Sequence, residues 1–159
     1  MIYIGIDPGL HGAIAVLSSE GELVEIIDAP VTNIGTKGKV KNVYVESSIV
    51  SFFEKYKDAI VGIEKQQAMT KQGVTSTFQT GYGFGMYIGM ISALHMPTHI
   101  ITPQKWKKEM MYGMGKEKSA SCIKAQQLFP NAELFTPRGR ALDGRADALL
   151  IATYLKTIL

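Results

Sequence analysis

The hydrophobic pattern along the chain predicts five short strands. They span residues 2–7, 13–17, 23–27, 59–64 and 99–101, and alternating positions give each of the better-defined strands two distinct faces. Turn residues at 8–12 and 18–21 separate the first three strands, so these three are expected to form an antiparallel meander.

Apolar positions spaced three or four apart predict helices in the rest of the chain. Helices are expected over residues 45–58, 72–94, 118–129 and 141–158, and a lysine-rich helix is expected to start at Pro103. Residues 30–41 are polar and contain glycine, which favours a loop. The element order predicts an α/β fold in which helices cover both faces of a five-stranded mixed sheet. No repeat or linker divides residues 1–159, so one domain is expected.

Two acidic residues close predicted strands, Asp7 in the first and Glu64 in the fourth. Each follows a glycine two positions earlier on the same face, Gly5 and Gly62. These glycines leave the sheet bare and make room for another element beside the acids. The alternatives are that Asp7 only opens a turn and that Glu64 is an ordinary surface residue.

The last predicted helix carries two more acids, Asp143 and Asp147, four residues apart on one face that continues into apolar residues. Asp143 is either part of a carboxylate cluster or only a helix N-cap, whereas Asp147 lies a full turn inside the helix. Four converging carboxylates repel one another, and a hard divalent cation relieves this repulsion. Mg²⁺ is expected, with Mn²⁺ as a substitute, and two ions about 4 Å apart would suit phosphodiester hydrolysis. The three histidines lack metal-ligand spacing, although His11 is close to Asp7 in sequence.

The net charge of +3 is modest, but the lysines are concentrated. This concentration favours a polyanionic partner such as DNA, and an ordinary solvated surface is the alternative. The lysines concerned are Lys37, Lys39, Lys41, Lys105, Lys107, Lys108, Lys116 and Lys118. A single cysteine, Cys122, excludes an internal disulfide and fits a cytoplasmic rather than a secreted protein. The apolar run at residues 81–94 is shorter than a membrane span requires.

Four segments in order resemble the RuvC-like Holliday junction resolvases of the ribonuclease H-like superfamily. They are Gly5-Ile6-Asp7-Pro8-Gly9, Gly62-Ile63-Glu64, the segment from Trp106-Lys107 to Lys118, and the helix that starts near Asp143. Two features differ from many members: no aromatic residue follows Glu64 within residues 65–69, and the last two aspartates are four rather than three apart. The compact size is similar to phage or organellar branches, and a phage protein would act in the host cytoplasm.

The resemblance implies a ribonuclease H-like sheet whose second strand is antiparallel to its neighbours. It also implies a magnesium-dependent endonuclease that nicks Holliday junctions or other branched DNA and leaves a 5′-phosphate and a 3′-hydroxyl. Asp7, Glu64, Asp143 and Asp147 would bind the metal, and Lys107 or Lys118 would support the scissile phosphate. The alternatives are a YqgF-like nuclease acting on RNA and a non-catalytic junction-binding module; the chain is too short for the two lobes of the hexokinase and actin branch.

Glycines at every fourth position, Gly81, Gly85 and Gly89, form a stripe on the long predicted helix. Each costs about 1 kcal/mol in a helix relative to alanine, so close packing against this stripe is expected. A junction offers two equivalent strands, and symmetric cutting requires two active sites related by a twofold axis. The stripe is therefore predicted to be a homodimer interface, or alternatively to let the helix lie close on its own sheet.

Overall fold

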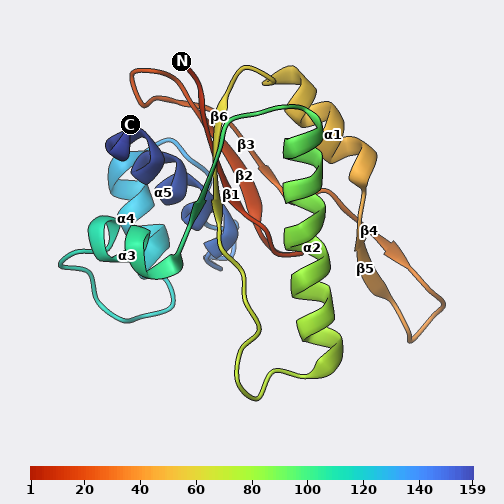
Figure 1. Cartoon of the computed structure of the whole chain (residues 1–159). Helices are drawn as coiled ribbons and strands as arrows, with labels where there is room; N and C mark the ends of the chain where they lie inside the picture. The colour runs from red at the N-terminus through yellow and green to blue at the C-terminus, as the bar shows by residue number, and fades with distance from the viewer.

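A five-stranded mixed sheet forms the centre of the molecule, as Figure 1 shows for the computed structural model of residues 1–159. Its strands are β1 (Tyr3–Asp7), β2 (Ala13–Leu17), β3 (Leu23–Asp28), β6 (Ile60–Glu64) and β7 (Thr98–Ile101), in the order β3-β2-β1-β6-β7. β2 is antiparallel to both neighbours, whereas β1, β6 and β7 run parallel. The predicted mixed sheet with an antiparallel second strand is confirmed.

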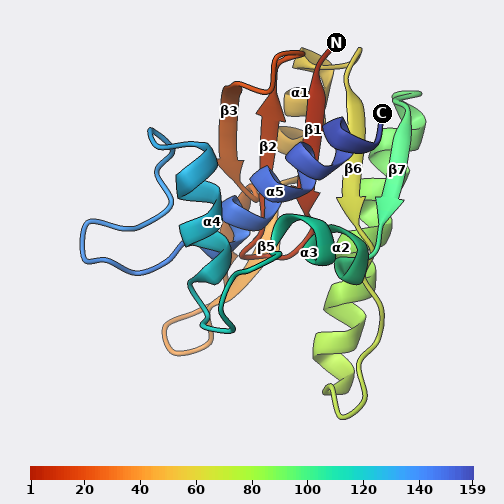
Figure 2. The ribbon, with the colours of Figure 1, turned by 90° about the vertical axis from the view of Figure 1, so that its left-hand side faces the viewer.

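Helices cover both faces of this sheet, as predicted. One face carries α3 (Pro103–Met110), α4 (Ala120–Leu128) and α5 (Asp143–Ile158), and the other carries α1 (Glu46–Lys55) and α2 (Val74–Ala93). Figure 2 shows α5 crossing the sheet diagonally over β2, β1 and β6. Two hydrophobic clusters result, one on each side of the sheet. No helix combines the length and the apolar character needed to cross a lipid bilayer.

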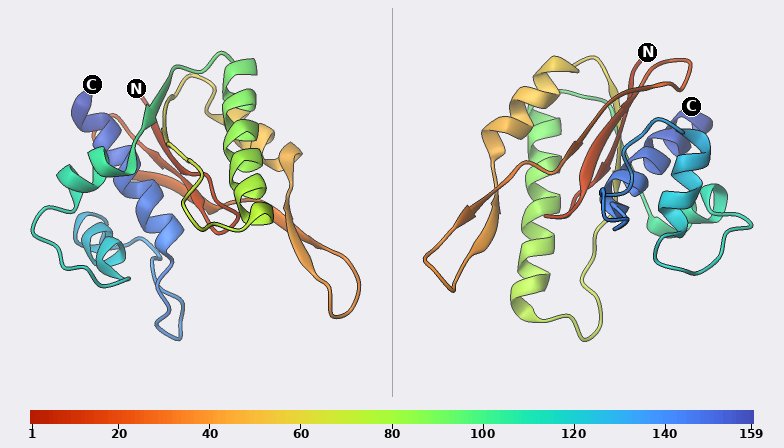
Figure 3. Two further views of the ribbon diagram at one scale, coloured as in Figure 1. Left: turned by 60° about the horizontal axis from the view of Figure 1, so that its bottom comes forward. Right: turned by 180° about the vertical axis from the view of Figure 1, so that it is seen from behind.

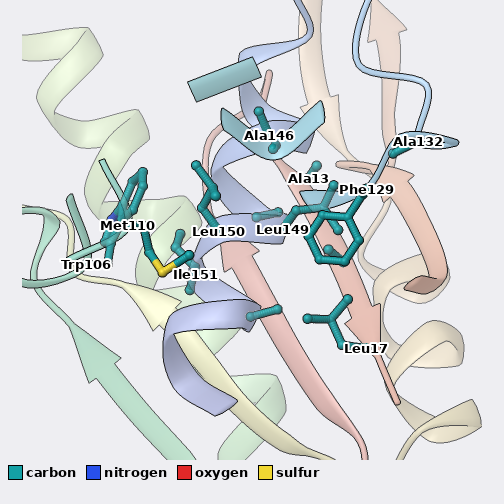
Figure 4. Close-up of a cluster of buried hydrophobic side chains, with 14 of the residues drawn as sticks. Ala13, Leu17, Trp106, Met110, Phe129, Ala132, Ala146, Leu149, Leu150 and Ile151 are labelled. Atoms are coloured by element: carbon teal, nitrogen blue, oxygen red, sulfur yellow. The ribbon is translucent and has the colours of Figure 1, made fainter. Parts of the chain in front are cut away.

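Glycines in β1 and β6 allow α5 to approach the sheet closely. A Cβ atom at Gly5 would collide with the Ala148 carbonyl oxygen of α5, and one at Gly62 would lie 3.3 Å from Leu155 Cβ. The prediction that these glycines make room for another element is confirmed. Beyond them, α5 buries Leu149, Leu150 and Ile151 between the sheet and the side chains of α3 and α4, as Figure 4 shows.

The prediction of a loop over residues 30–41 is wrong, because this region contributes to a β-hairpin. β4 (Val31–Ile34) pairs antiparallel with β5 (Lys41–Tyr44) and forms a separate two-stranded sheet. Gly35 and Gly38 take positive φ values of 116° and 89° at the tip, as glycine does readily. Both faces of β4 are exposed, so no alternation of apolar and polar residues marks the hairpin in the sequence.

The glycine stripe of α2 points away from the rest of the chain. No heavy atom lies within 4 Å of a Cβ built at Gly81, Gly85 or Gly89. The alternative in which the stripe lies close on its own sheet is therefore wrong. The closely packed glycine of this helix is Gly83, where a Cβ would collide with the Tyr44 hydroxyl oxygen.

Candidate active site

Asp7 and Glu64 lie side by side because β1 and β6 are parallel and in register. Ile6 is opposite Ile63, so both strands deliver their final carboxylate to the same edge of the sheet. Burial is the largest of the effects that raise the pKa of Asp7 to about 7. The charges of Asp147 and Glu64 act in the same direction, and Lys107 acts against them. The sheet edge therefore holds closely spaced acids that share one electrostatic environment.

α5 brings the other two acids to this edge. Burial raises the pKa of Asp147 to about 6; the Ser121 hydroxyl and Lys107 act in the opposite direction. Its Oδ1 atom is buried and has no hydrogen-bond partner. Asp143 is exposed at the first turn of α5 and influences Asp147 electrostatically. The structure thus gathers the four predicted carboxylates, whose catalytic roles remain predictions.

The interpretation of Asp143 as the N-cap of this helix is wrong. Leu142 occupies the N-cap position, and no side chain caps the helix. The Asp143 Oδ1 atom accepts a hydrogen bond from the Cys122 thiol at 3.5 Å. Burial, followed by the charge of Asp143, raises the pKa of Cys122 to about 12, so the thiol stays protonated and keeps its donor role.

Two donors that the sequence did not indicate hold Glu64 in place. The Trp106 indole donates from Nε1 to Oε2 of Glu64 at 2.6 Å, and Gln66 donates from Nε2 to Oε1 at 3.1 Å. Trp106 is fully buried, so its N–H requires an internal acceptor. The need of a buried indole N–H for an acceptor is the signal that could have suggested such a role for this tryptophan.

The lysines predicted to contact the phosphate are found next to the carboxylates. Lys107 and Lys118 line, together with Asp143 and Asp147, a cavity of about 400 Å³. Lys107 Nζ lies 5.1 Å above the centre of the Trp106 ring, a cation–π geometry that holds it beside the donor to Glu64. Both lysines are exposed and accessible to a polyanion.

The remaining predicted lysines are exposed and fall into two groups. Lys37, Lys39 and Lys41 belong to the β4–β5 hairpin, and the second group lies on α3 and the following loop: Lys105, Lys108 and Lys116. Figure 3 shows the hairpin and the loop at residues 111–119 extending to opposite sides of the molecule, with the strand ends between them. The basic residues therefore flank the acidic edge on two sides.

A second cavity, of about 490 Å³, lies on the far side of Asp143. His11 and Arg140 line it together with Arg145, which forms an ion pair with Asp28 at 2.7 Å. Arg140 is an exposed cation near the acids that the sequence analysis did not single out. His11 lies close to Asp143 through this cavity, and no role is assigned to it.

The acidic edge fits a hard divalent cation, although no three of its side chains already form a closed ligand group. Mg²⁺ commonly binds through one or two carboxylates and completes its shell with water and substrate phosphate, so a closed group is not required. The raised pKa values of Asp7 and Asp147 and the unpartnered Oδ1 of Asp147 indicate negative charge that lacks a counter-charge. The donors are all oxygen atoms, which suits Mg²⁺ or Mn²⁺.

No protein-family model and no curated protein matches the sequence. Among solved structures, RuvC of Thermus thermophilus in complex with a Holliday junction substrate matches with a TM-score of 0.66. The match covers 99% of this chain and 94% of that chain at 15% sequence identity. The chain has the RuvC-like ribonuclease H fold. A second RuvC structure from Thermus thermophilus matches with a TM-score of 0.59 at 18% identity, covering 99% of this chain and 95% of that one. The predicted RuvC-like fold is confirmed. At sequence identities this low, the similarity establishes the fold and not the function.

Proposed function

We propose that this protein is a metal-dependent endonuclease that nicks Holliday junctions or other branched DNA. The observation that carries the proposal is the set of buried, mutually coupled carboxylates where β1 and β6 end, with Asp7 at its centre. Lysines on both sides of this edge support a nucleic-acid substrate. The RuvC-like fold supports branched DNA, because one of the similar structures contains a Holliday junction substrate.

In this mechanism Asp7, Glu64, Asp143 and Asp147 would hold Mg²⁺ or Mn²⁺, two ions per active site. The bound ions would activate a water molecule and stabilise the leaving oxygen of the phosphodiester, giving a 5′-phosphate and a 3′-hydroxyl. The chain's own residues orient the acids and the substrate. Trp106 and Gln66 fix the Glu64 carboxylate through its two oxygens. Lys107 and Lys118 stabilise negative charge on the phosphate from the cavity that they share with Asp143 and Asp147.

Each protomer supplies one nuclease domain, and the proposed active form is a homodimer through the outer face of α2. This face carries Val74 and Phe78, which are 88% and 73% exposed, beside the open glycine stripe. Exposed apolar residues next to glycines permit two helices to approach closely. A twofold axis through this face would present two acidic edges to the two equivalent strands of a junction.

A cleavage assay on four-way, three-way and linear DNA, and on matched RNA, tests this function. Wild-type protein is expected to nick four-way or three-way DNA only when Mg²⁺ is present, and Asp7→Asn is expected to abolish nicking. Asp58→Asn, a matched change at an exposed position, serves as the control. Cleavage of RNA alone would favour an RNA nuclease, and wild-type cleavage rates with Asp7→Asn would refute the mechanism.

A further inference from the structure

A cavity of about 600 Å³ lies beside the acidic edge, on the α2 side of the sheet. Besides Tyr44, three amide side chains and three aliphatic hydroxyl side chains contribute to its lining: Asn42, Gln66, Gln79, Thr75, Ser76 and Thr80. They come from β5, from the segment after β6 and from the first half of α2. Pockets of about 300–1,000 Å³ hold small organic ligands, so the volume suffices for a nucleoside.

The cavity adjoins the residues next to two of the carboxylates. Its wall includes Pro8 and Gly9, the two residues that follow Asp7. Gln66 belongs to both sites, because it lines the cavity and donates a hydrogen bond to Glu64 at 3.1 Å. The Tyr44 hydroxyl donates to the Pro8 carbonyl oxygen at 3.1 Å and fixes this wall. A ligand in the cavity would therefore be a near neighbour of the group that Asp7 and Glu64 act on.

The lining defines the chemistry of that ligand. It contains no carboxylate and a single cation, Lys41, so it suits neither a metal ion nor a polyphosphate. Asn and Gln side chains pair with base edges through one donor and one acceptor, and Ser and Thr hydroxyls serve as either. The Gln72 amide donates to Ser76 and Thr80, whereas Asn42 and Gln79 line the cavity and their amides have no hydrogen-bond partner in the protein.

We propose that this cavity binds one unstacked nucleobase of the strand being cut and reads its edge through Asn42 and Gln79. The inference rests on the proposed nuclease function and adds a site of base selection to it. Extruding a base costs a few kcal/mol in a duplex and least where bases are already unpaired, as at a branch point. The cavity therefore favours branched over linear DNA and imposes a base preference at one position next to the cut.

This use of α2 is compatible with a dimer through the same helix. The cavity is lined by Thr75, Ser76 and Gln79, whereas the proposed dimer face contains Phe78 and Gly81. At 100° per residue, these two sets lie on different sides of the helix. Base binding and dimerisation can therefore occur together.

The test combines single abasic substitutions around the cleavage site of a four-way junction with the variants Asn42→Ala and Gln79→Ala. Removing the base at one position is expected to lower the nicking rate of the wild-type protein about tenfold, the loss typical of a bidentate base contact. Each variant should show a similar loss on the intact junction and little further loss on that abasic junction. If the variant and the abasic substitution lowered the nicking rate independently at every position, so that the two losses multiplied, the inference would be overturned.

Two matched controls separate the cavity from general surface effects. Asn33 lies directly opposite Asn42 in the hairpin and is exposed, and Gln127 is an exposed glutamine on α4. Asn33→Ala and Gln127→Ala should retain both the wild-type rate and its abasic sensitivity. Equal losses in the controls would also overturn the inference.

A binding readout distinguishes failure of this inference from failure of the proposed function. 2-Aminopurine placed at the sensitive position should brighten when wild-type protein binds without Mg²⁺, and brighten less with Asn42→Ala. If this fluorescence change is seen but no nicking occurs in Mg²⁺, the base site is supported and the proposed nuclease function is refuted. Nicking with no position that depends on Asn42 or Gln79 would refute the base site alone, and absence of junction binding would refute both.

Discussion

Replacing Asp7 by asparagine is predicted to stabilise the protein at pH 8. The folded state raises the pKa of Asp7 from 3.8 to about 7, mainly through burial and then through Asp147 and Glu64. Between these two values the folded state binds a proton that the unfolded state has released. The free energy of unfolding therefore falls as the pH rises from about 4 to about 7. Asparagine does not ionise and removes this dependence.

The shift of about 3 pKa units sets an upper limit of about 4 kcal/mol, at 1.36 kcal/mol per unit. Water and counter-ions relax part of this penalty, so we expect about 2 kcal/mol at pH 8. For a chain of this size, such a gain corresponds to an increase of about 4–8 °C in the melting temperature. The difference between Asp7→Asn and the wild type should be small near pH 4, where the wild-type carboxyl is protonated in the folded state and about half protonated in the unfolded state.

Thermal unfolding followed by circular dichroism between pH 4 and pH 8, with Asp58→Asn as the exposed control, measures this effect. Adding Mg²⁺ at pH 8 should raise the melting temperature of the wild type more than that of Asp7→Asn, because the variant lacks one charged ligand. The same variant should lose nicking while gaining stability. A variant less stable than the wild type at pH 8, or a difference that does not change with pH, would refute the electrostatic reasoning.

Three further changes test the contacts around the site and the proposed dimer face. Trp106→Phe removes the hydrogen-bond donor to Glu64 and should lower the free energy of unfolding by about 1–3 kcal/mol. It should also raise the Mg²⁺ concentration needed for half-maximal nicking. An unchanged Mg²⁺ titration would contradict this orienting role. Gly5→Ala should prevent stable folding, as judged by circular dichroism, because its Cβ would collide with the backbone of α5; a melting temperature within a few degrees of the wild type would show that the helix can shift away. A leucine at position 85 would face open space within the protomer, so Gly85→Leu should fold. In sedimentation this variant should be a monomer where the wild type is a dimer. A dimeric variant would place the interface elsewhere.

The sheet and the positions of its acids could be predicted because strand patterns carry their own register. Alternation in β1 places Ile4 and Ile6 in one hydrophobic cluster and Tyr3 in the other, as the two clusters of the structure confirm. Once β1 and β6 are parallel neighbours, the final residues Asp7 and Glu64 must meet at one edge. The β4–β5 hairpin escaped prediction because β4 is exposed on both faces and so carries no alternation of apolar and polar residues.

The contacts that orient the acids depend on tertiary placement, which periodicity does not encode. Trp106 and Glu64 are separated by 42 residues and meet only because α3 follows the neighbouring strand β7 and folds back over the sheet edge. The Cys122 contact with Asp143 likewise requires α4 to pack on α5. Residue types indicated which groups needed partners, whereas the fold determined which partners they found.

The position of the basic hairpin relative to the carboxylates depends on Tyr44. This side chain leaves the end of β5, donates to the Pro8 carbonyl beside Asp7, and lies edge-on to Tyr87 of α2 with ring centres 6.1 Å apart. Its hydroxyl fits only because residue 83 is glycine. A single buried ring thus joins the hairpin, the long helix and the turn that follows Asp7. Tyr44 therefore anchors the base of the hairpin beside the carboxylates, although the hairpin forms a separate two-stranded sheet.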